Sequence, residues 1–141
     1  MNDNTPIGAT GPRDTISELR AVLSAFPQVE LAIVFGSVAR GLERPHSDVD
    51  IAVAERRALS AEQKITLIEA MAERTGRAID LIDLRTVGEP LLGQILRHGR
   101  RLLGTDRAYG ELLSRHLIDQ ADFMPYHDRI LAERRAAWIG Q

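Results

Sequence analysis

Three short apolar runs constrain the fold of this chain more than any other feature of its sequence. They are VELAIVF at 29–35, DVDIAV at 48–53 and AIDLIDL at 78–84. Each run is short and contains β-branched residues, so each predicts a β-strand. Segments with helical spacing or turn residues lie between the runs, and this order predicts an α/β or α+β domain in which helices pack on a small mixed sheet.

The segments between the strands carry helix signals. Ser60 and Gln63 have the spacing of a capping box, and Thr15 and Glu18 have the same spacing near the N-terminus. We expect helices at 14–26, 37–40, 60–75 and 90–98, an edge strand at 100–103, and a helical tail from about 106. Pro125 is expected to kink or split that tail, because proline interrupts the helical hydrogen bonds.

The size and composition of the chain predict one domain. Its 141 residues suit a single hydrophobic core, and 44% of them are apolar. We expect residues 1–13 to be a flexible lead-in and residues 14–141 to form one domain, with C-terminal helices from about 106. The chain has no cysteine, which excludes disulfides and thiolate metal sites.

Charge and hydropathy bear on partners and location. The net charge is −2, so no global basic field attracts nucleic acid or a membrane surface. No apolar segment reaches the roughly 18 residues that a membrane span needs. The first residues lack a basic start followed by an apolar core, so we expect no signal peptide. We therefore predict a cytoplasmic protein without direct nucleic-acid or membrane partners.

Gly36 and Ser37 follow the first predicted strand. A glycine lets the backbone approach an anion closely, and a serine adds a hydroxyl and a backbone N–H at a helix start. Helix N-termini present unpaired N–H groups and the positive end of the helix dipole, which suits a phosphate. Taken alone, however, a Gly-Ser pair after a strand is most often a simple turn.

Asp48 and Asp50 are two positions apart at the second predicted strand. Alternate residues of a strand face the same side, so the two carboxylates are expected to be neighbours. Like charges this close are unfavourable without a cation, and Mg²⁺ is commonly held by one or two carboxylates plus substrate phosphates. The alternative is a pair of solvated strand-end residues. The apolar Val49, Ile51 and Val53 indicate that the other face of the strand is buried. Two carboxylates on such a strand therefore call for a functional explanation.

The combination is more specific than its parts. Gly-Ser, ten residues and Asp-X-Asp are bracketed by two strands, with Arg40-Gly41 inside the spacer and Ser47 just before the first aspartate. This pattern resembles the polymerase β-like nucleotidyltransferases. The chain length and the AIDLID strand resemble the minimal nucleotidyltransferase (MNT) branch. The resemblance covers 29–103 and, more loosely, the tail, where DFMP at 122–125 and the Arg-rich end resemble MNT antitoxins paired with HEPN toxins.

The resemblance implies a role for each residue of the pattern. Gly36 and Ser37 would hold the triphosphate of a nucleotide, and Asp48 and Asp50 would bind two Mg²⁺ ions. Such sites are completed by a third carboxylate from a neighbouring strand. Asp80 is our choice, because it leads the AIDLID strand. It would help to bind one metal ion and would accept the proton of an attacking hydroxyl.

Three further residues leave alternatives open. Asp83 is the rival of Asp80, but it faces the opposite side if the strand is regular, and its alternative role is an exposed residue at a strand end. Arg40 is a candidate phosphate ligand or a solvated loop arginine. Ser47 is a candidate nucleotide contact or a support for the first aspartate, and its alternative role is a turn serine.

The resemblance implies a function for the whole protein. By this resemblance we expect an Mg²⁺-dependent protein adenylyltransferase that transfers AMP from ATP to a tyrosine of a HEPN-family RNase toxin and so acts as its antitoxin. One alternative is a nucleotidyltransferase that modifies a small molecule, although 141 residues leave little room for a further substrate-binding domain. The other is a non-enzymatic antitoxin that blocks the toxin by binding, which would predict a damaged metal site.

Apolar residues of the helical tail have two possible uses. They cover the sheet, or a remainder stays exposed and binds a partner. They are Tyr109, Leu112, Leu113, Leu117, Phe123, Met124, Ile130, Leu131 and Trp138.

Overall fold

A four-stranded mixed sheet forms the centre of the computed structural model, which describes residues 12–121. The strands are β1 (Leu31–Phe35), β2 (Val49–Ala54), β3 (Ile79–Asp83) and β4 (Arg100–Gly104). Their order is β3-β2-β1-β4, with β1 antiparallel to β2 and β4, and β2 parallel to β3. The predicted small mixed sheet is therefore confirmed, with each strand end within two residues of its expected place.

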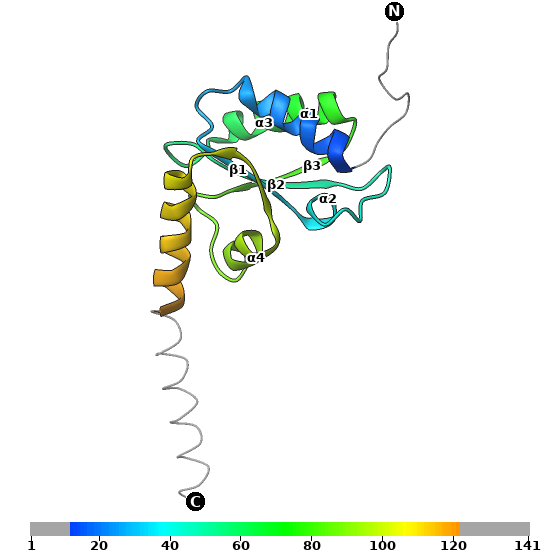
Figure 1. Cartoon of the computed structure of the whole chain (residues 1–141). Helices are drawn as coiled ribbons and strands as arrows, with labels where there is room; N and C mark the ends of the chain where they lie inside the picture. Colours follow the sequence, from blue (N-terminus) through cyan, green and yellow to red (C-terminus); the bar gives the residue numbers. More distant parts are fainter. Residues whose placement is uncertain (1–11, 122–141) are drawn as a thin grey trace, which may run out of the picture.

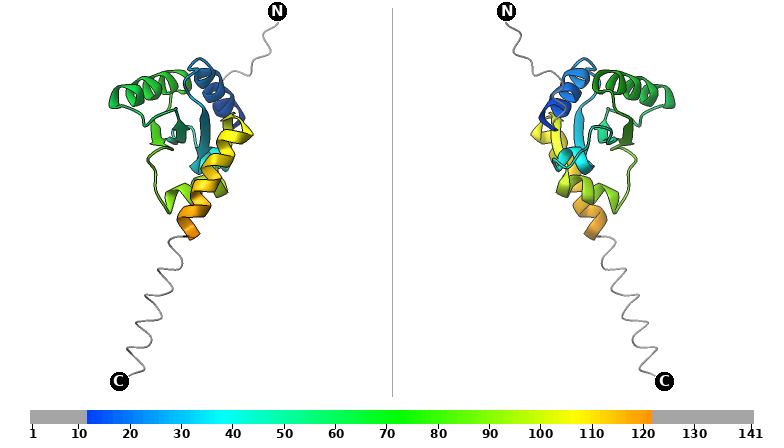
Figure 2. Two further views of the ribbon diagram at one scale, coloured as in Figure 1. Left: turned by 90° about the vertical axis from the view of Figure 1, so that its left-hand side faces the viewer. Right: turned by 90° about the vertical axis from the view of Figure 1, so that its right-hand side faces the viewer.

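Helices cover both faces of this sheet. They are α1 (Pro12–Ser24), α2 (Gly36–Ala39), α3 (Ala61–Thr75) and α4 (Leu91–His98), followed by a helical segment over 106–121. Figure 1 and Figure 2 show α1 and α3 side by side on one face, with α4 and the 106–121 helix on the other side of the sheet. The alternation of helices and strands predicted from the sequence is confirmed for the described residues.

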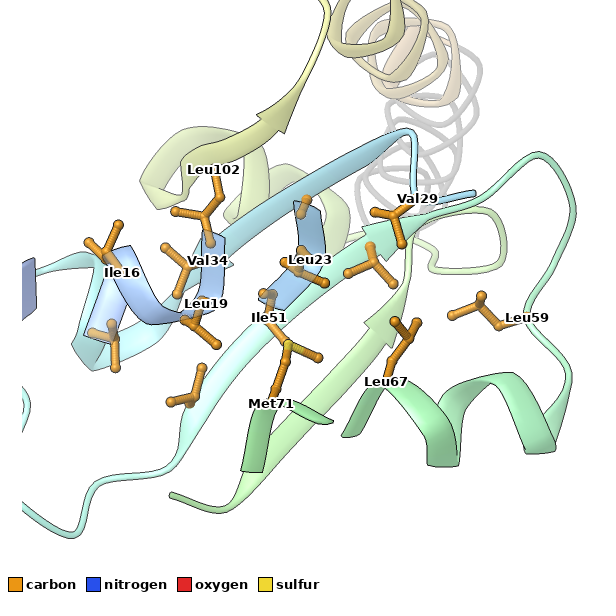
Figure 3. Packing of buried hydrophobic residues seen from close by; sticks show 14 residues of the cluster. Ile16, Leu19, Leu23, Val29, Val34, Ile51, Leu59, Leu67, Met71 and Leu102 are labelled. Atoms are coloured by element: carbon orange, nitrogen blue, oxygen red, sulfur yellow. The ribbon is translucent and has the colours of Figure 1, made fainter. Parts of the chain in front are cut away.

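The two faces of the strands feed two separate cores, because successive strand side chains point to opposite sides. On one face, Val34 and Ile51 pack against apolar residues of α1 and α3 (Figure 3). On the other face, Ile33 and Ala52 pack against α4 and the 106–121 helix. Both faces of β1 and β2 are thus buried along most of their length, and the sheet is a rigid base for residues at its ends.

One of the two expected capping boxes is present. The hydroxyl of Ser60 accepts a hydrogen bond from the Gln63 N–H (3.1 Å), and the Gln63 side chain accepts one from the Ser60 N–H (2.8 Å). The box expected at Thr15 is wrong, because α1 begins three residues earlier, at Pro12. Proline is favoured at a first helical position, since its φ is fixed and it has no N–H to leave unpaired. Thr15 instead donates to Glu43 (3.3 Å).

The 106–121 helix covers the sheet and also leaves part of its apolar surface exposed, and binding of a partner by that surface stays a prediction. Arg115 donates to the carbonyls of Leu84 (2.7 Å) and Val87 (3.0 Å), and Leu112 is buried against the sheet. On the other side of the helix, Leu113, Leu117 and Ile118 are exposed, at 38%, 57% and 60%. The helix therefore covers the sheet with one side and presents apolar side chains to solvent with the other.

Several expectations concern parts of the chain outside the described residues. They are the flexible lead-in up to residue 11, the Pro125 kink, the DFMP motif at 122–125 and the apolar residues beyond it. Within residues 12–121, no helix combines the length and the apolar composition needed to cross a bilayer.

We expect Ser60→Ala to lower the free energy of unfolding by about 1 kcal/mol, because the substitution leaves an N-terminal N–H of α3 without its acceptor. Denaturant unfolding measures the change. The matched control is Ser114→Ala, at an exposed position inside the 106–121 helix. Equal effects of the two substitutions would contradict the capping role.

Candidate active site

Gly36 forms the sharp turn between β1 and α2. Its φ is +71°, in the left-handed region where residues with a Cβ are strained. Phe35, the last residue of β1, pairs with Asp50 of β2, and a Cβ at Gly36 would collide with the Asp50 carboxylate. Two independent constraints therefore require glycine here, and they place a bare backbone directly beside an acidic side chain.

Asp50 and Asp80 occupy matching positions on neighbouring strands. β2 and β3 run parallel, and Asp50 is the register partner of Asp80. By strand alternation Asp50 shares its face with Ala52, and Asp80 shares its face with Ile82, both of which belong to the core under α4. The two carboxylates therefore project from the same face of the sheet, next to Gly36. Asp50 is half-buried and Asp80 is exposed.

The surroundings of Asp50 disfavour its charge. Burial raises the pKa of the Asp50 carboxyl, and the neighbouring Asp80 carboxylate raises this pKa further through its charge and a hydrogen bond. The Asp48 carboxylate adds a smaller contribution in the same direction. A carboxyl perturbed by burial and by two like charges is a feature of functional sites, because a bound cation relieves all three effects.

Asp48 lies outside the strand where it was expected. β2 begins at Val49, so Asp48 is the last residue of the preceding loop, and its side chain is exposed. Across residues 12–121, no three histidine, cysteine, aspartate or glutamate side chains converge tightly enough to cage a metal ion. The arrangement is instead a close Asp50–Asp80 pair with Asp48 nearby. A small number of carboxylate oxygens suits Mg²⁺, because this ion usually keeps several water ligands and takes further ligands from substrate phosphates.

Asp83 has a structural role, and its expected exposure is wrong. The side chain is buried, and its two oxygens accept hydrogen bonds from the backbone N–H groups of Leu59 (2.8 Å) and Arg85 (2.9 Å). These bonds tie the end of β3 to the segment that leads into α3. Asp80 is therefore the carboxylate of this strand that lies beside Asp50.

The remaining candidates lie on α2 and on the loop after it. Ser37 is half-buried in α2, and its carbonyl accepts from the Leu42 N–H (2.9 Å). Arg40 is exposed at the end of α2. The Ser47 hydroxyl accepts from the Arg44 N–H (2.7 Å), so it closes a turn within the loop. A nucleotide contact by any of these three side chains stays a prediction.

The sequence reading missed a buried ion pair between the loop after α2 and the short segment that joins α3 to β3. Arg77 and Glu43 approach to 3.3 Å, and their side chains are only 4% and 2% exposed. Two charged residues far apart in sequence give no local pattern, and each taken alone is typical of a surface. Only the tertiary structure brings the two side chains together, and Glu43 itself belongs to the loop that carries Asp48.

We expect Asp50→Asn to raise the thermal stability of the metal-free protein at pH 7. The folded-state pKa of Asp50 lies above its unfolded value, so stability falls as pH rises from about 4 through that raised pKa. The gain should be no more than about 1 kcal/mol, because solvent screens a half-exposed group. Thermal unfolding in a chelator, from pH 4 to pH 7, measures it.

Addition of Mg²⁺ provides the second half of this test. Mg²⁺ should stabilise the unsubstituted protein more than the Asp50→Asn variant, because a ligand stabilises the folded state more the more tightly it binds to it. Glu69→Gln, at an exposed carboxylate of α3, is the matched control. If both variants respond to pH and Mg²⁺ like the unsubstituted protein, the electrostatic account of Asp50 is wrong.

Comparisons with known proteins agree with this geometry. The family model described as Polymerase beta, Nucleotidyltransferase matches residues 17–108, which is more than half of the chain. The chain is 32% identical over 81 residues to the protein adenylyltransferase MntA of Shewanella oneidensis. That alignment covers 57% of this chain and 58% of the length of MntA.

Two solved structures extend the comparison to the fold. A crystal structure of a toxin–antitoxin with AMP-PNP contains a chain that is 26% identical, with a TM-score of 0.65 over 82% of this chain and 98% of that one. A structure assigned as a minimal nucleotidyltransferase is 28% identical, with a TM-score of 0.57 over 66% of this chain and 97% of that one. With the fold, the Gly36 turn and the paired carboxylates, these matches lead to one conclusion: the chain belongs to the polymerase β nucleotidyltransferase family.

Proposed function

We propose that this protein transfers AMP from ATP to a partner protein and thereby acts as an antitoxin. The observation that carries the proposal is the placement of Asp50 against Gly36 and beside Asp80. It puts a glycine backbone, suited to a phosphate, within one site with carboxylates suited to a divalent cation. The similarity to MntA, a protein adenylyltransferase, supports AMP as the transferred group.

Nucleotide binding is assigned to the β1–α2 turn. Gly36 has no side chain between its backbone and a ligand, and Ser37 adds a hydroxyl and an N–H at the start of α2. We assign the triphosphate to this turn, with Arg40 as a further phosphate ligand from the exposed end of α2. Ser47 supports the nucleotide indirectly, since its hydroxyl closes the loop before Asp48.

Asp48, Asp50 and Asp80 are the residues that would hold Mg²⁺, with two ions expected. An ion held by these residues would supply positive charge to the phosphates and to the attacking and leaving oxygens. The raised pKa of Asp50 supports this assignment, because burial and, to a smaller extent, the Asp80 and Asp48 carboxylates disfavour its charge, which a bound cation would stabilise. The residues of the chain contribute to the reaction mainly by holding their charges in fixed positions around the reacting groups.

The transfer step is a displacement at the α-phosphorus of ATP. The acceptor hydroxyl oxygen forms a bond to that phosphorus, and the bond to the oxygen that bridges to the β-phosphorus breaks. Pyrophosphate leaves, and the hydroxyl proton passes to a carboxylate. We assign this base to Asp80, which is the exposed member of the Asp50–Asp80 pair. Its exposure leaves room for an acceptor to approach.

The proposed acceptor is a tyrosine of a HEPN-family RNase toxin that forms a hetero-oligomer with this protein. Similarity to a chain of a toxin–antitoxin complex with AMP-PNP supports a toxin partner and an adenine nucleotide. We further propose that residues 14–141 form a single domain. Cytoplasmic location, and the absence of direct nucleic-acid or membrane partners, stay predictions.

We expect incubation of the product of the adjacent gene, the proposed toxin, with this protein, ATP and Mg²⁺ to add one or more AMP units to a tyrosine of that product. Intact-mass and peptide mass spectrometry measure the addition. Asp48→Ala/Asp50→Ala should abolish it, because the metal ligands are lost, whereas Glu69→Gln should leave it unchanged. Toxin RNase activity, assayed in parallel, should fall only where AMP is added.

Two outcomes would overturn the proposal in different ways. If the toxin is neutralised in a stable complex without a mass gain, and equally by Asp48→Ala/Asp50→Ala, the protein is a binding antitoxin. If the toxin stays unmodified and active while ATP is consumed only when a small-molecule acceptor is added, the acceptor class is wrong. Both outcomes leave the family membership intact.

A further inference from the structure

The loop between α2 and β2 lacks regular secondary structure, yet it joins both halves of the site. It starts after Arg40, at the end of the proposed phosphate turn, and it ends at Asp48. Most of its side chains face solvent. Whatever fixes the path of residues 41–48 therefore also fixes the distance between the phosphate turn and the first carboxylate.

Arg77 ties this loop to the body of the protein at several points. It lies between the end of α3 and the start of β3, and its side chain is almost fully buried. Nη1 donates to the carbonyls of Arg44 (2.7 Å) and Ser47 (3.2 Å), and Nη2 approaches Glu43 at 3.3 Å. One guanidinium thus holds three positions of the loop at once.

The last of these contacts is directly adjacent to the site. The Ser47 carbonyl belongs to the peptide group that leads into Asp48, so a donor on that oxygen orients the peptide from which Asp48 extends. On the other side of Asp48, the Val49 N–H donates to the Ala78 carbonyl (2.9 Å), next to Arg77 in sequence. Residues 77 and 78 therefore fix the backbone on both sides of Asp48.

We propose that Arg77 is a positioning residue for the metal and nucleotide site. It acts through the loop: it presents Asp48 beside the Asp50–Asp80 pair without touching the substrate. The proposal rests on the proposed function for the identity of the ligand, an Mg²⁺–nucleotide complex. Arginine suits the task because its planar fork offers several donors in fixed directions, whereas lysine offers a single mobile ammonium group.

Glu43 makes a purely structural role distinguishable from a positioning role. Removal of Arg77 alone leaves a buried carboxylate without its cation, which destabilises the fold whatever happens to Asp48. Glu43→Gln combined with Arg77→Met removes that charge as well. The double variant should therefore recover stability, but the carbonyls of Arg44 and Ser47 still lack the guanidinium donor of Arg77.

The test compares Arg77→Met, Arg77→Lys and Glu43→Gln/Arg77→Met in the full-length protein. Calorimetric titration with Mg²⁺ and AMP-PNP measures binding without any transfer step. We expect Arg77→Met to weaken binding about 10–100-fold, the usual effect of losing a residue that supports metal ligands. Arg77→Lys should have an intermediate effect, and the double variant should stay weak despite its recovered stability.

Amide hydrogen exchange in a chelator provides a readout that needs neither metal nor nucleotide. We expect faster exchange across residues 41–49 in Arg77→Met and in the double variant, because the loop has lost its anchor. The rest of the sheet in the double variant should exchange at the original rate.

Arg115→Met is the matched control. Arg115 likewise binds backbone carbonyls, those of Leu84, Arg85 and Val87, but it fastens the 106–121 helix and not the loop. It should lower stability and leave Mg²⁺–AMP-PNP affinity unchanged. If the double variant regains full affinity, or if Arg115→Met weakens binding as much as Arg77→Met, Arg77 is only a structural ion-pair partner.

The outcomes also separate this proposal from the proposed function. If the unsubstituted protein binds Mg²⁺–AMP-PNP but transfers no AMP to a toxin, the adenylyltransferase assignment fails and the Arg77 comparison remains valid. If transfer occurs and Arg77→Met binds and transfers normally with an ordered loop, the positioning role fails and the enzyme assignment stands.

Discussion

The contact between the Asp50 carboxylate and the bare Cα of Gly36 determines the layout of the site. It exists because β1 pairs with β2 up to Phe35 and Asp50, so the chain must turn beside the acidic side chain. A Cβ at this position would overlap the Asp50 carboxylate, so the turn or the carboxylate would have to move. The parallel pairing of β3 then adds Asp80 next to Asp50. The Gly36 turn, Asp50 and Asp80 are thus held together by the sheet, whereas Asp48 depends on the loop that precedes β2.

This arrangement carries an electrostatic cost that the rest of the fold offsets. Ionised Asp50 beside two other carboxylates opposes the folded state, and a chain selected for stability alone would avoid such a cluster. The two apolar cores on either side of the sheet supply the compensating stability. A locally unfavourable group of charges inside a well-packed fold is typical of functional sites. The proposed ligand, a divalent cation with a polyphosphate, is the chemistry that removes the conflict.

Local patterns in the sequence predicted most of the fold, and tertiary contacts account for the errors. The apolar runs that form strands and the Ser60 capping box depend on residues close in sequence, so the sequence alone predicts them. Asp80 was chosen from its place on a strand, but its register with Asp50 depends on which strands pair. The buried Glu43–Arg77 pair and the burial of Asp83 join distant segments. The residues at Thr15 have the spacing of a capping box, but the helix starts at Pro12 and Thr15 therefore lies inside it.

A crystal structure with AMP-PNP and Mn²⁺ in place of Mg²⁺ tests the central claim most directly, because Mn²⁺ can be located by its anomalous scattering. The account predicts at least one Mn²⁺ bound to Asp50, with Asp48 or Asp80 as a further ligand, and the triphosphate against the backbone of Gly36 and Ser37. A nucleotide bound elsewhere, or Mn²⁺ bound without Asp50, would contradict it.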